Sequence, residues 1–210
     1  MKKKAFIFLN GTMDTKQEFY KNILKNQTDI FCADGGLKFA LEMNLKPLEI
    51  WGDLDSCNEN LIDQAKKSNC KIIKFNPEKD LTDGELLISE ISKRNYDEII
   101  ILGGLGGRTD HFLTNLNLLF KYNNLIFISH KETIFKVEQN FNIKNKTNKT
   151  ISFVPFSDKV ENLTLTGFKY PLNNFLLSRG DSICNSNIII DSNANIKFSK
   201  GNLIGIIENL

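Results

Sequence analysis

Two segments of the chain combine residue types that suit metal and phosphate chemistry. Trp51-Gly52-Asp53-Leu54-Asp55-Ser56 contains two carboxylates, and Gly103-Gly104-Leu105-Gly106-Gly107-Arg108-Thr109-Asp110-His111 contains four glycines followed by polar residues. Carboxylate oxygens are ligands that Mg²⁺ prefers. Glycine-rich backbone ahead of a helix lets N–H groups approach an anion closely. If both segments reach one site, they indicate an enzyme that works on a metal–nucleotide complex.

Asp53 and Asp55 lie two residues apart at the end of a short apolar run. Side chains two apart in extended chain face the same way, so both carboxylates can reach one cation. The alternative is structural, because Asp55 or Ser56 could cap a helix that begins at Glu59. The pattern by itself is compatible with both interpretations.

The segment Lys79-Asp80-Leu81-Thr82-Asp83 also has two interpretations. Asp83 could be a third metal ligand, and Lys79 could meet a phosphate as a point charge. Thr82 and Glu85 also fit a capping box, with Asp83 in the first turn of the helix. Taken alone the cap is favoured, although both can hold because anion sites form readily at helix N-termini.

The glycine-rich segment favours a binding function over a tight turn. Four glycines within five residues cost much conformational entropy on folding, and their use is close backbone approach to an anion. Arg108 adds a bidentate partner for phosphate oxygens. We expect His111 to be a neutral hydrogen-bonding group, because a helix N-terminus lowers the pKa of a histidine. The segment is neither a Walker A loop nor a complete G-x-G-x-x-G fingerprint.

The elements that would position these segments are predicted by an alternation of short apolar runs and amphipathic stretches. The predicted strands are residues 5–9, 29–33, 48–51, 71–75, 98–102 and 125–129, and the predicted helices are 15–25, 37–43, 59–68, 83–93 and 109–122. The alternation predicts an α/β domain over residues 1–130, with an open, mostly parallel sheet and flanking helices. Ligands of such sheets bind at the carboxyl ends of the strands, where the polar segments and Asp34 fall.

The pattern changes after about residue 130. Residues 138–150 are polar, and short β runs separated by turn residues follow without a long helix. The predicted strands there are 151–155, 160–166, 175–177, 183–190, 196–198 and 203–207. These features predict a C-terminal all-β sandwich over residues 131–210.

Composition narrows the possible partners. The formal net charge is +2, and no basic stripe indicates a nucleic-acid partner. The apolar run from Ala5 to Leu9 is too short for a signal peptide or a membrane span. The four cysteines form no C-x-x-C pair and no zinc spacing, which favours reduced thiols. We therefore expect a cytoplasmic protein with no membrane or nucleic-acid partner.

Taken together, the motifs resemble the thiamin pyrophosphokinase family. They are A-D-G-G from Ala33, G-D-L-D-S from Gly52, K-D-L-T-D from Lys79 and G-G-L-G-G-R-T-D-H from Gly103. The carboxyl part is similar as well, with G-F-K-Y from Gly167 and an S-N pair at Ser186. The resemblance covers nearly the whole chain.

The resemblance implies an α/β catalytic domain followed by a thiamin-binding β-sandwich. It also implies a homodimer, in which the sandwich of one subunit completes the site of the other. The implied reaction is Mg²⁺-dependent and transfers the β,γ-pyrophosphoryl group of ATP to the hydroxyl of thiamin. Its products are thiamin diphosphate and AMP.

Roles are carried over residue by residue. The implied Mg²⁺ ligands are Asp53, Asp55 and Asp83, and the implied catalytic residues are these three with Asp80, Arg108 and Asp110. The implied ATP contacts are Asp34, Gly35, Gly36, Lys79, Gly106, Gly107 and Arg108. The implied thiamin contacts are Thr82, Asp110, His111, Tyr170, Ser186 and Asn187.

Two departures and two alternative functions remain. Ile188 stands where many relatives carry Glu, and the only tryptophan is Trp51, so stacking on thiamin falls to Tyr170 or Phe175.

A nucleotide-sugar glycosyltransferase would share the D-x-D pattern, but it leaves the glycine segment and the sandwich unexplained. A non-catalytic nucleotide or thiamin sensor would not need the complete acidic set.

Overall fold

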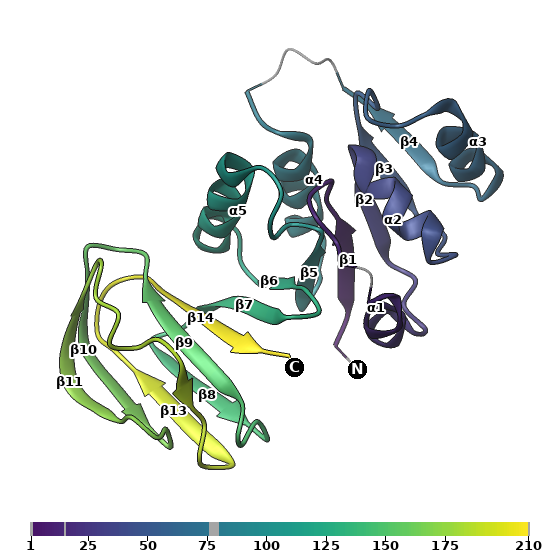
Figure 1. Cartoon of the computed structure of the whole chain (residues 1–210). Helices are drawn as coiled ribbons and strands as arrows, with labels where there is room; N and C mark the ends of the chain where they lie inside the picture. Colours follow the sequence, from purple (N-terminus) through teal and green to yellow (C-terminus); the bar gives the residue numbers. More distant parts are fainter. Residues whose placement is uncertain (1, 15, 76–79, 210) are drawn as a thin grey trace. The chain divides into compact units, whose positions relative to one another are not determined.

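The computed structural model describes residues 2–14, 16–75 and 80–209. The chain forms two compact units, Met1–His130 and Lys131–Leu210 (Figure 1). The first unit is mixed α/β, and the second contains strands and turns. The predicted fold class, an α/β part followed by an all-β part, is therefore confirmed.

The first unit is built on a parallel sheet. Six strands form it within the described residues: β1 (Lys4–Phe8), β2 (Ile30–Ala33), β3 (Glu49–Gly52), β4 (Lys71–Lys74), β5 (Glu98–Leu102) and β6 (Leu125–Ile128). Their order is β6-β5-β1-β2-β3-β4, and every neighbouring pair is parallel. The chain thus adds strands on one side of β1 and then returns to its other side. That reversal between β1 and β5 is where open α/β sheets bind ligands.

Helices cover both faces of this sheet. They are α1 (Gln17–Leu24), α2 (Leu37–Glu42), α3 (Glu59–Lys67), α4 (Asp83–Ser92) and α5 (Thr109–Lys121). Ile30 and Cys32 of β2 share a core cluster with residues of α1, α2 and α3. Successive strand residues face opposite sides, so Phe31 and Ala33 face the side where α4 packs on β2 and β3. None of the described helices is long and apolar enough to cross a membrane.

Two helix starts resolve the capping questions raised by the sequence. Thr82 Oγ1 accepts a hydrogen bond from the Glu85 N–H at 3.2 Å, so the Thr82 half of the predicted capping box is confirmed. The Glu85 carboxylate does not complete the box, because it accepts from Lys121 Nζ and the Tyr122 hydroxyl of the α5 end. The cap of α3 is Asn58, whose Oδ1 accepts from the Leu61 N–H at 2.9 Å. The suggestion that Asp55 or Ser56 caps this helix is therefore wrong.

The second unit is a sandwich of two antiparallel sheets. Its strands are β7 (Glu132–Val137), β8 (Asn140–Lys144), β9 (Thr150–Pro155), β10 (Lys159–Thr166), β11 (Leu172–Ser178), β12 (Asn187–Ile188), β13 (Asn193–Lys197) and β14 (Leu203–Glu208). One sheet has the order β12-β9-β14-β7 and the other β11-β10-β13-β8. Phe153 and Leu203 from the first share one core cluster with Leu165 and Ile196 from the second. This shared core is what defines a sandwich.

The differences from prediction lie in this second unit. The polar stretch at 138–150 contains β8, where Phe141 and Ile143 alternate with exposed Asn and Lys residues. A strand with one solvent-facing side needs only two or three inward apolar residues, so the polar composition of this stretch hid the strand from sequence analysis. The predicted strand at 183–190 shrinks to β12, because residues 183–186 form a turn that ends at Ser186, whose φ is +54°.

The Asn58 cap gives a direct test of the α3 start. Asn58→Ala removes the only side-chain cap seen for α3 in the described residues. Urea unfolding should show a loss of about 1 kcal/mol in the free energy of unfolding. Asn60→Ala is the control, since Asn60 is exposed and, among the described residues, accepts from the Gln64 side chain without capping the helix. An equal loss in both variants would contradict the assigned cap.

Candidate functional site

A cavity of about 670 Å³ in the first unit collects most of the predicted site residues. Those that line it are Asp34, Asp53, Asp55, Asp80, Thr82, Asp83, Gly106, Gly107, Arg108 and His111. Gly35 and Gly36 are buried and do not line it, nor does Asp110. Lys79 lies outside the described residues. The cavity opens at the carboxyl ends of β1, β2, β3 and β5, as expected for a parallel sheet.

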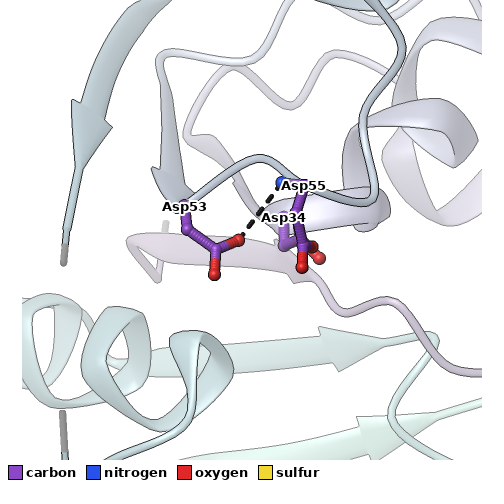
Figure 2. Close-up of side chains that lie close together, drawn as sticks. All are labelled: Asp34, Asp53 and Asp55. Atoms are coloured by element: carbon purple, nitrogen blue, oxygen red, sulfur yellow. Dashed lines mark hydrogen bonds between the residues drawn. The ribbon is translucent and has the colours of Figure 1, made fainter. Parts of the chain in front are cut away.

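Three carboxylates meet in this cavity. Oxygens of Asp34, Asp53 and Asp55 lie within 4.8 Å of one another (Figure 2). Asp53 Oδ1 also accepts from the Asp55 N–H at 3.2 Å, which fixes the bend at the end of β3. Three carboxylate oxygens are a donor set suited to a hard divalent cation.

The third member of the cluster is Asp34, whereas the sequence suggested Asp83. The Asp83 carboxylate is near: a Cβ atom on Gly52 would lie 3.2 Å from Asp83 Oδ1 and 3.2 Å from the Asp34 Cβ. Asp83 therefore faces the residue that precedes Asp53. It approaches from the N-terminus of α4, whereas Asp34 approaches from the end of β2.

Asp34 is held in an uncommon conformation. Its φ is +46°, a left-handed value that costs energy for a residue with a side chain. Its Oδ1 is buried and has no hydrogen-bond partner among the described residues. Its carbonyl oxygen accepts from the Cys57 Sγ at 3.4 Å. Backbone strain and an orphaned buried oxygen in one residue indicate that a ligand completes its environment.

The glycine loop lies against the segment that follows β1. Gly103, Gly106 and Gly107 have φ values of +66°, +79° and +81°, which favour glycine. The Gly11 N–H donates to the Gly103 carbonyl at 2.9 Å, and a Cβ on Gly11 would lie 2.3 Å from that oxygen. No side chain fits there, so this contact explains Gly11.

Sequence reasoning missed this first segment. Asn10, Gly11 and Thr12 line the cavity, and Asn115 of α5 does so as well. Asn10-Gly11-Thr12 follows the first apolar run, so the strand-end rule that selected the other motifs could also have found it. Asn115 sits inside a helix, and no local pattern marks it.

Arg108 and Asp110 form an exposed ion pair. Arg108 donates from Nη2 to Asp110 Oδ2 at 2.6 Å and from Nε to Oδ1 at 3.1 Å. The hydrogen bond from this guanidinium lowers the pKa of Asp110 to about 2, and the His111 N–H contributes to the shift. A carboxylate with so low a pKa is a weak base at neutral pH.

The predicted residues of the second unit differ in accessibility. Tyr170 is 54% exposed and Ser186 is exposed, but Asn187 is only 2% exposed. Asn187 Oδ1 accepts from the N–H groups of Tyr170 at 3.0 Å and Ile188 at 2.9 Å, and its Nδ2 donates to the Tyr170 carbonyl at 2.8 Å. Its amide is thus occupied in fixing the Tyr170 backbone. Phe175 packs against the sandwich core.

Comparison with known proteins follows the same two-unit division. Residues 20–129 match the family model "Thiamin pyrophosphokinase, catalytic domain", and residues 132–203 match "Thiamin pyrophosphokinase, vitamin B1 binding domain". A thiamine pyrophosphokinase of Bacillus subtilis is 38% identical over 180 residues, which cover 83% of this chain and 84% of that protein. Thiamin pyrophosphokinase 1 of Caenorhabditis elegans is 26% identical, over 96% of this chain and 88% of that protein.

Solved structures agree. The crystal structure of the B. subtilis thiamine pyrophosphokinase superposes with a TM-score of 0.86 at 32% identity, covering 99% of this chain and 100% of that chain. Thiamin pyrophosphokinase from Geobacillus thermodenitrificans gives a TM-score of 0.84 at 28% identity, covering 98% and 97%.

The Arg108–Asp110 pair makes a prediction about titration. Arg108→Gln removes the cation that stabilises the carboxylate, so the pKa of Asp110 should rise from about 2 toward its ordinary value of roughly 3.9. A carbon-13 NMR titration of the Asp110 carboxyl would measure this. Arg179→Gln, which breaks an exposed pair with Asp158 in the other unit, should leave Asp110 unchanged. An unshifted Asp110 in Arg108→Gln would refute the assigned cause.

The Cys57 contact makes a prediction about cation affinity. Cys57→Ala removes the hydrogen bond to the Asp34 carbonyl, so Mg²⁺ binding measured by calorimetry should weaken by roughly threefold to tenfold. Cys70→Ala is the matched control. Cys70 is also buried, and burial raises the pKa of the Cys57 and Cys70 thiols to about 11. The Cys70 Sγ donates to the Lys71 carbonyl, and Cys70 does not line the cavity. Equal affinities in both variants would show that the thiol does not position Asp34.

Proposed function

The chain belongs to the thiamin pyrophosphokinase family, and on that premise we propose how its residues hold ATP, Mg²⁺ and thiamin. The enzyme is an ATP-dependent diphosphotransferase that converts ATP and thiamin to AMP and thiamin diphosphate. The observation that best supports the proposed residue roles is that a carboxylate cluster and a glycine loop line the same cavity. A glycosyltransferase would not explain a match over both units, and a sensor would not need these carboxylates.

Asp34, Asp53 and Asp55 are the proposed Mg²⁺ ligands. Their oxygens are close enough to share one ion, and the buried Asp34 Oδ1 has no other partner among the described residues. When bound, the ion would offset the negative charge of the triphosphate and help to orient it. Asp83 is the proposed fourth acidic group, because it faces Gly52 beside this cluster.

The glycine loop that follows β5 forms the proposed phosphate-binding side of the cavity. The glycine loop leads directly into α5, and the first N–H groups of a helix lack intrahelical partners. These groups and the partial positive charge of the helix N-terminus suit phosphate oxygens. Arg108 is 72% exposed at its side chain, so a phosphate can replace Asp110 as its partner.

The reaction requires alignment more than covalent assistance. The thiamin hydroxyl must lie in line with the β-phosphorus, and AMP must be stabilised as it leaves. Glycine-loop N–H groups and Arg108 are placed to stabilise developing charge on phosphate oxygens. Asp80 and Thr82, on the cavity wall before α4, are proposed to border the transferred group. The low pKa of Asp110 favours a role as the resting partner of Arg108 over that of a general base.

Thiamin is assigned to the second unit, which matches the vitamin B1 binding domain. Tyr170 offers an exposed ring for a cationic ligand, and Ser186 offers an exposed hydroxyl. Asn187 supports the Tyr170 backbone from the interior, so its proposed contribution to thiamin binding is indirect. His111 is proposed to face the same substrate from the cavity of the first unit.

Assembly and location complete the proposal. The chain is proposed to act as a homodimer, in which the second unit of one subunit completes the cavity of the other. This rests on the family resemblance of both units. A cytoplasmic location is supported by four cysteines that are all free and buried.

The metal assignment is tested by Asp34→Asn, Asp53→Asn and Asp55→Asn. Each removes one charge with little change in shape, so turnover should fall by about a thousandfold. The assay incubates enzyme with ATP, Mg²⁺ and thiamin and quantifies AMP, ADP and thiamin diphosphate. Wild type should release AMP and thiamin diphosphate in equal amounts, and EDTA should abolish both. Mg²⁺ binding by calorimetry should weaken in the same three variants.

Asp63→Asn is the matched control for this experiment. Asp63 is an exposed carboxylate on α3 that pairs with Lys66 and does not line the cavity. It should behave as wild type in both assays. Near-normal Mg²⁺-dependent turnover in Asp53→Asn would contradict the metal assignment. Formation of ADP and thiamin monophosphate would mean that thiamin attacks the γ-phosphorus instead.

A further inference from the structure

Gly104, in the first half of the glycine loop, is held by two different elements. Its carbonyl oxygen accepts from the Asn115 Nδ2 of α5 at 2.9 Å. A Cβ atom on Gly104 would lie 2.7 Å from the Phe127 ring of β6, so the ring and the glycine are in close contact. The preceding carbonyl, of Gly103, accepts from the Gly11 N–H. Two consecutive carbonyls of the loop therefore accept hydrogen bonds from two different segments. Gly11, after β1, donates to the Gly103 carbonyl, and Asn115 of α5 donates to the Gly104 carbonyl.

We infer that Asn115 is a positioning residue for ATP, which acts by fixing the glycine loop against α5. This inference rests on the proposed phosphate-binding role of the loop. Asn115 is half-buried and lines the same cavity. It joins the loop to the body of the helix whose first turn follows that loop.

Peptide geometry explains how one side chain can orient the loop. The C=O of Gly104 and the N–H of Leu105 belong to one planar trans peptide, so fixing the carbonyl also fixes the following N–H. The positive-φ pair Gly106 and Gly107 comes next and leads directly into α5. The anchor at Gly104 thus sets the starting direction of the backbone that presents N–H groups to a phosphate.

The N-terminus of α5 is joined to the preceding loop differently from the capped helices α3 and α4. Arg108 is the N-cap residue, and within the described residues it makes no side-chain capping hydrogen bond. The side chain of Arg108 is directed to Asp110 instead. The entry to α5 therefore lacks the usual side-chain cap, and the Asn115 amide supplies a link between loop and helix about two turns later.

Asn117 provides a matched comparison on the same helix. It is exposed, and its Nδ2 donates to the Leu113 carbonyl within α5 at 2.8 Å. It does not line the cavity. The two asparagines therefore make the same kind of hydrogen bond, and only that of Asn115 reaches the glycine loop.

The test compares Asn115→Asp with Asn117→Asp in the full-length enzyme. In Asn115→Asp a carboxylate oxygen replaces the N–H donor and faces the Gly104 carbonyl, so the loop must move. Calorimetry with ATP and Mg²⁺, without thiamin, should show ATP binding about tenfold weaker, and steady-state assays should show a matching rise in KM for ATP. KM for thiamin should stay within about twofold of wild type, and Asn117→Asp should match wild type throughout.

A second variant keeps the inference testable if Asn115→Asp does not fold. Asn115→Ala removes the donor without adding a repulsive oxygen, and it should weaken ATP binding in the same direction by a smaller factor. A folded Asn115 variant with lowered thermal stability but wild-type ATP affinity would overturn the inference, because its role would then be structural only. If wild type binds ATP but forms no AMP, the proposed catalytic roles fail, and the binding comparison still decides this inference.

Discussion

The parallel pairing of β1 with β2 on one side and β5 on the other is the constraint on which the site depends. Five residue pairs join β1 to β5, from Lys4 opposite Glu98 to Phe8 opposite Leu102. Backbone contact then continues past the strands, through Leu9 to Leu102 and Gly11 to Gly103. Because parallel strands end at one edge, this pairing brings the loops after β1, β2, β3 and β5 into one cavity.

The cavity is lined both by groups that suit a cation and by groups that suit an anion. One side gathers three carboxylates, which repel one another and suit a cation. The other side presents glycine backbone, a helix N-terminus and Arg108, which suit an anion. The strained Asp34 backbone and its orphaned oxygen are tolerated because the strands beneath them are buried in apolar contacts. Stability of the core thus permits a locally unfavourable arrangement that a metal–nucleotide complex would relieve.

Asparagine amides have a recurring role in both units. Asn187 satisfies the backbone of Tyr170, Asn58 caps α3, and Asn115 holds the Gly104 carbonyl. An amide carries a donor and an acceptor without charge, so it can be buried against backbone at little electrostatic cost. Conversely, an asparagine so occupied is a poor substrate contact, which is why burial of Asn187 moves the expected thiamin contacts to Tyr170 and Ser186.

The sequence by itself determined the fold class, the alternating elements of the first unit and the strand ends that carry polar motifs. These follow from local periodicity and from local caps such as Thr82, which involve residues close in the chain. β8 escaped prediction because three of its five residues are exposed. Only the tertiary structure decided that Asp34 joins Asp53 and Asp55, that Gly11 packs on Gly103, and that Asn115 reaches Gly104. Each of these contacts joins segments whose proximity depends on strand order and loop path, and no local pattern encodes that proximity.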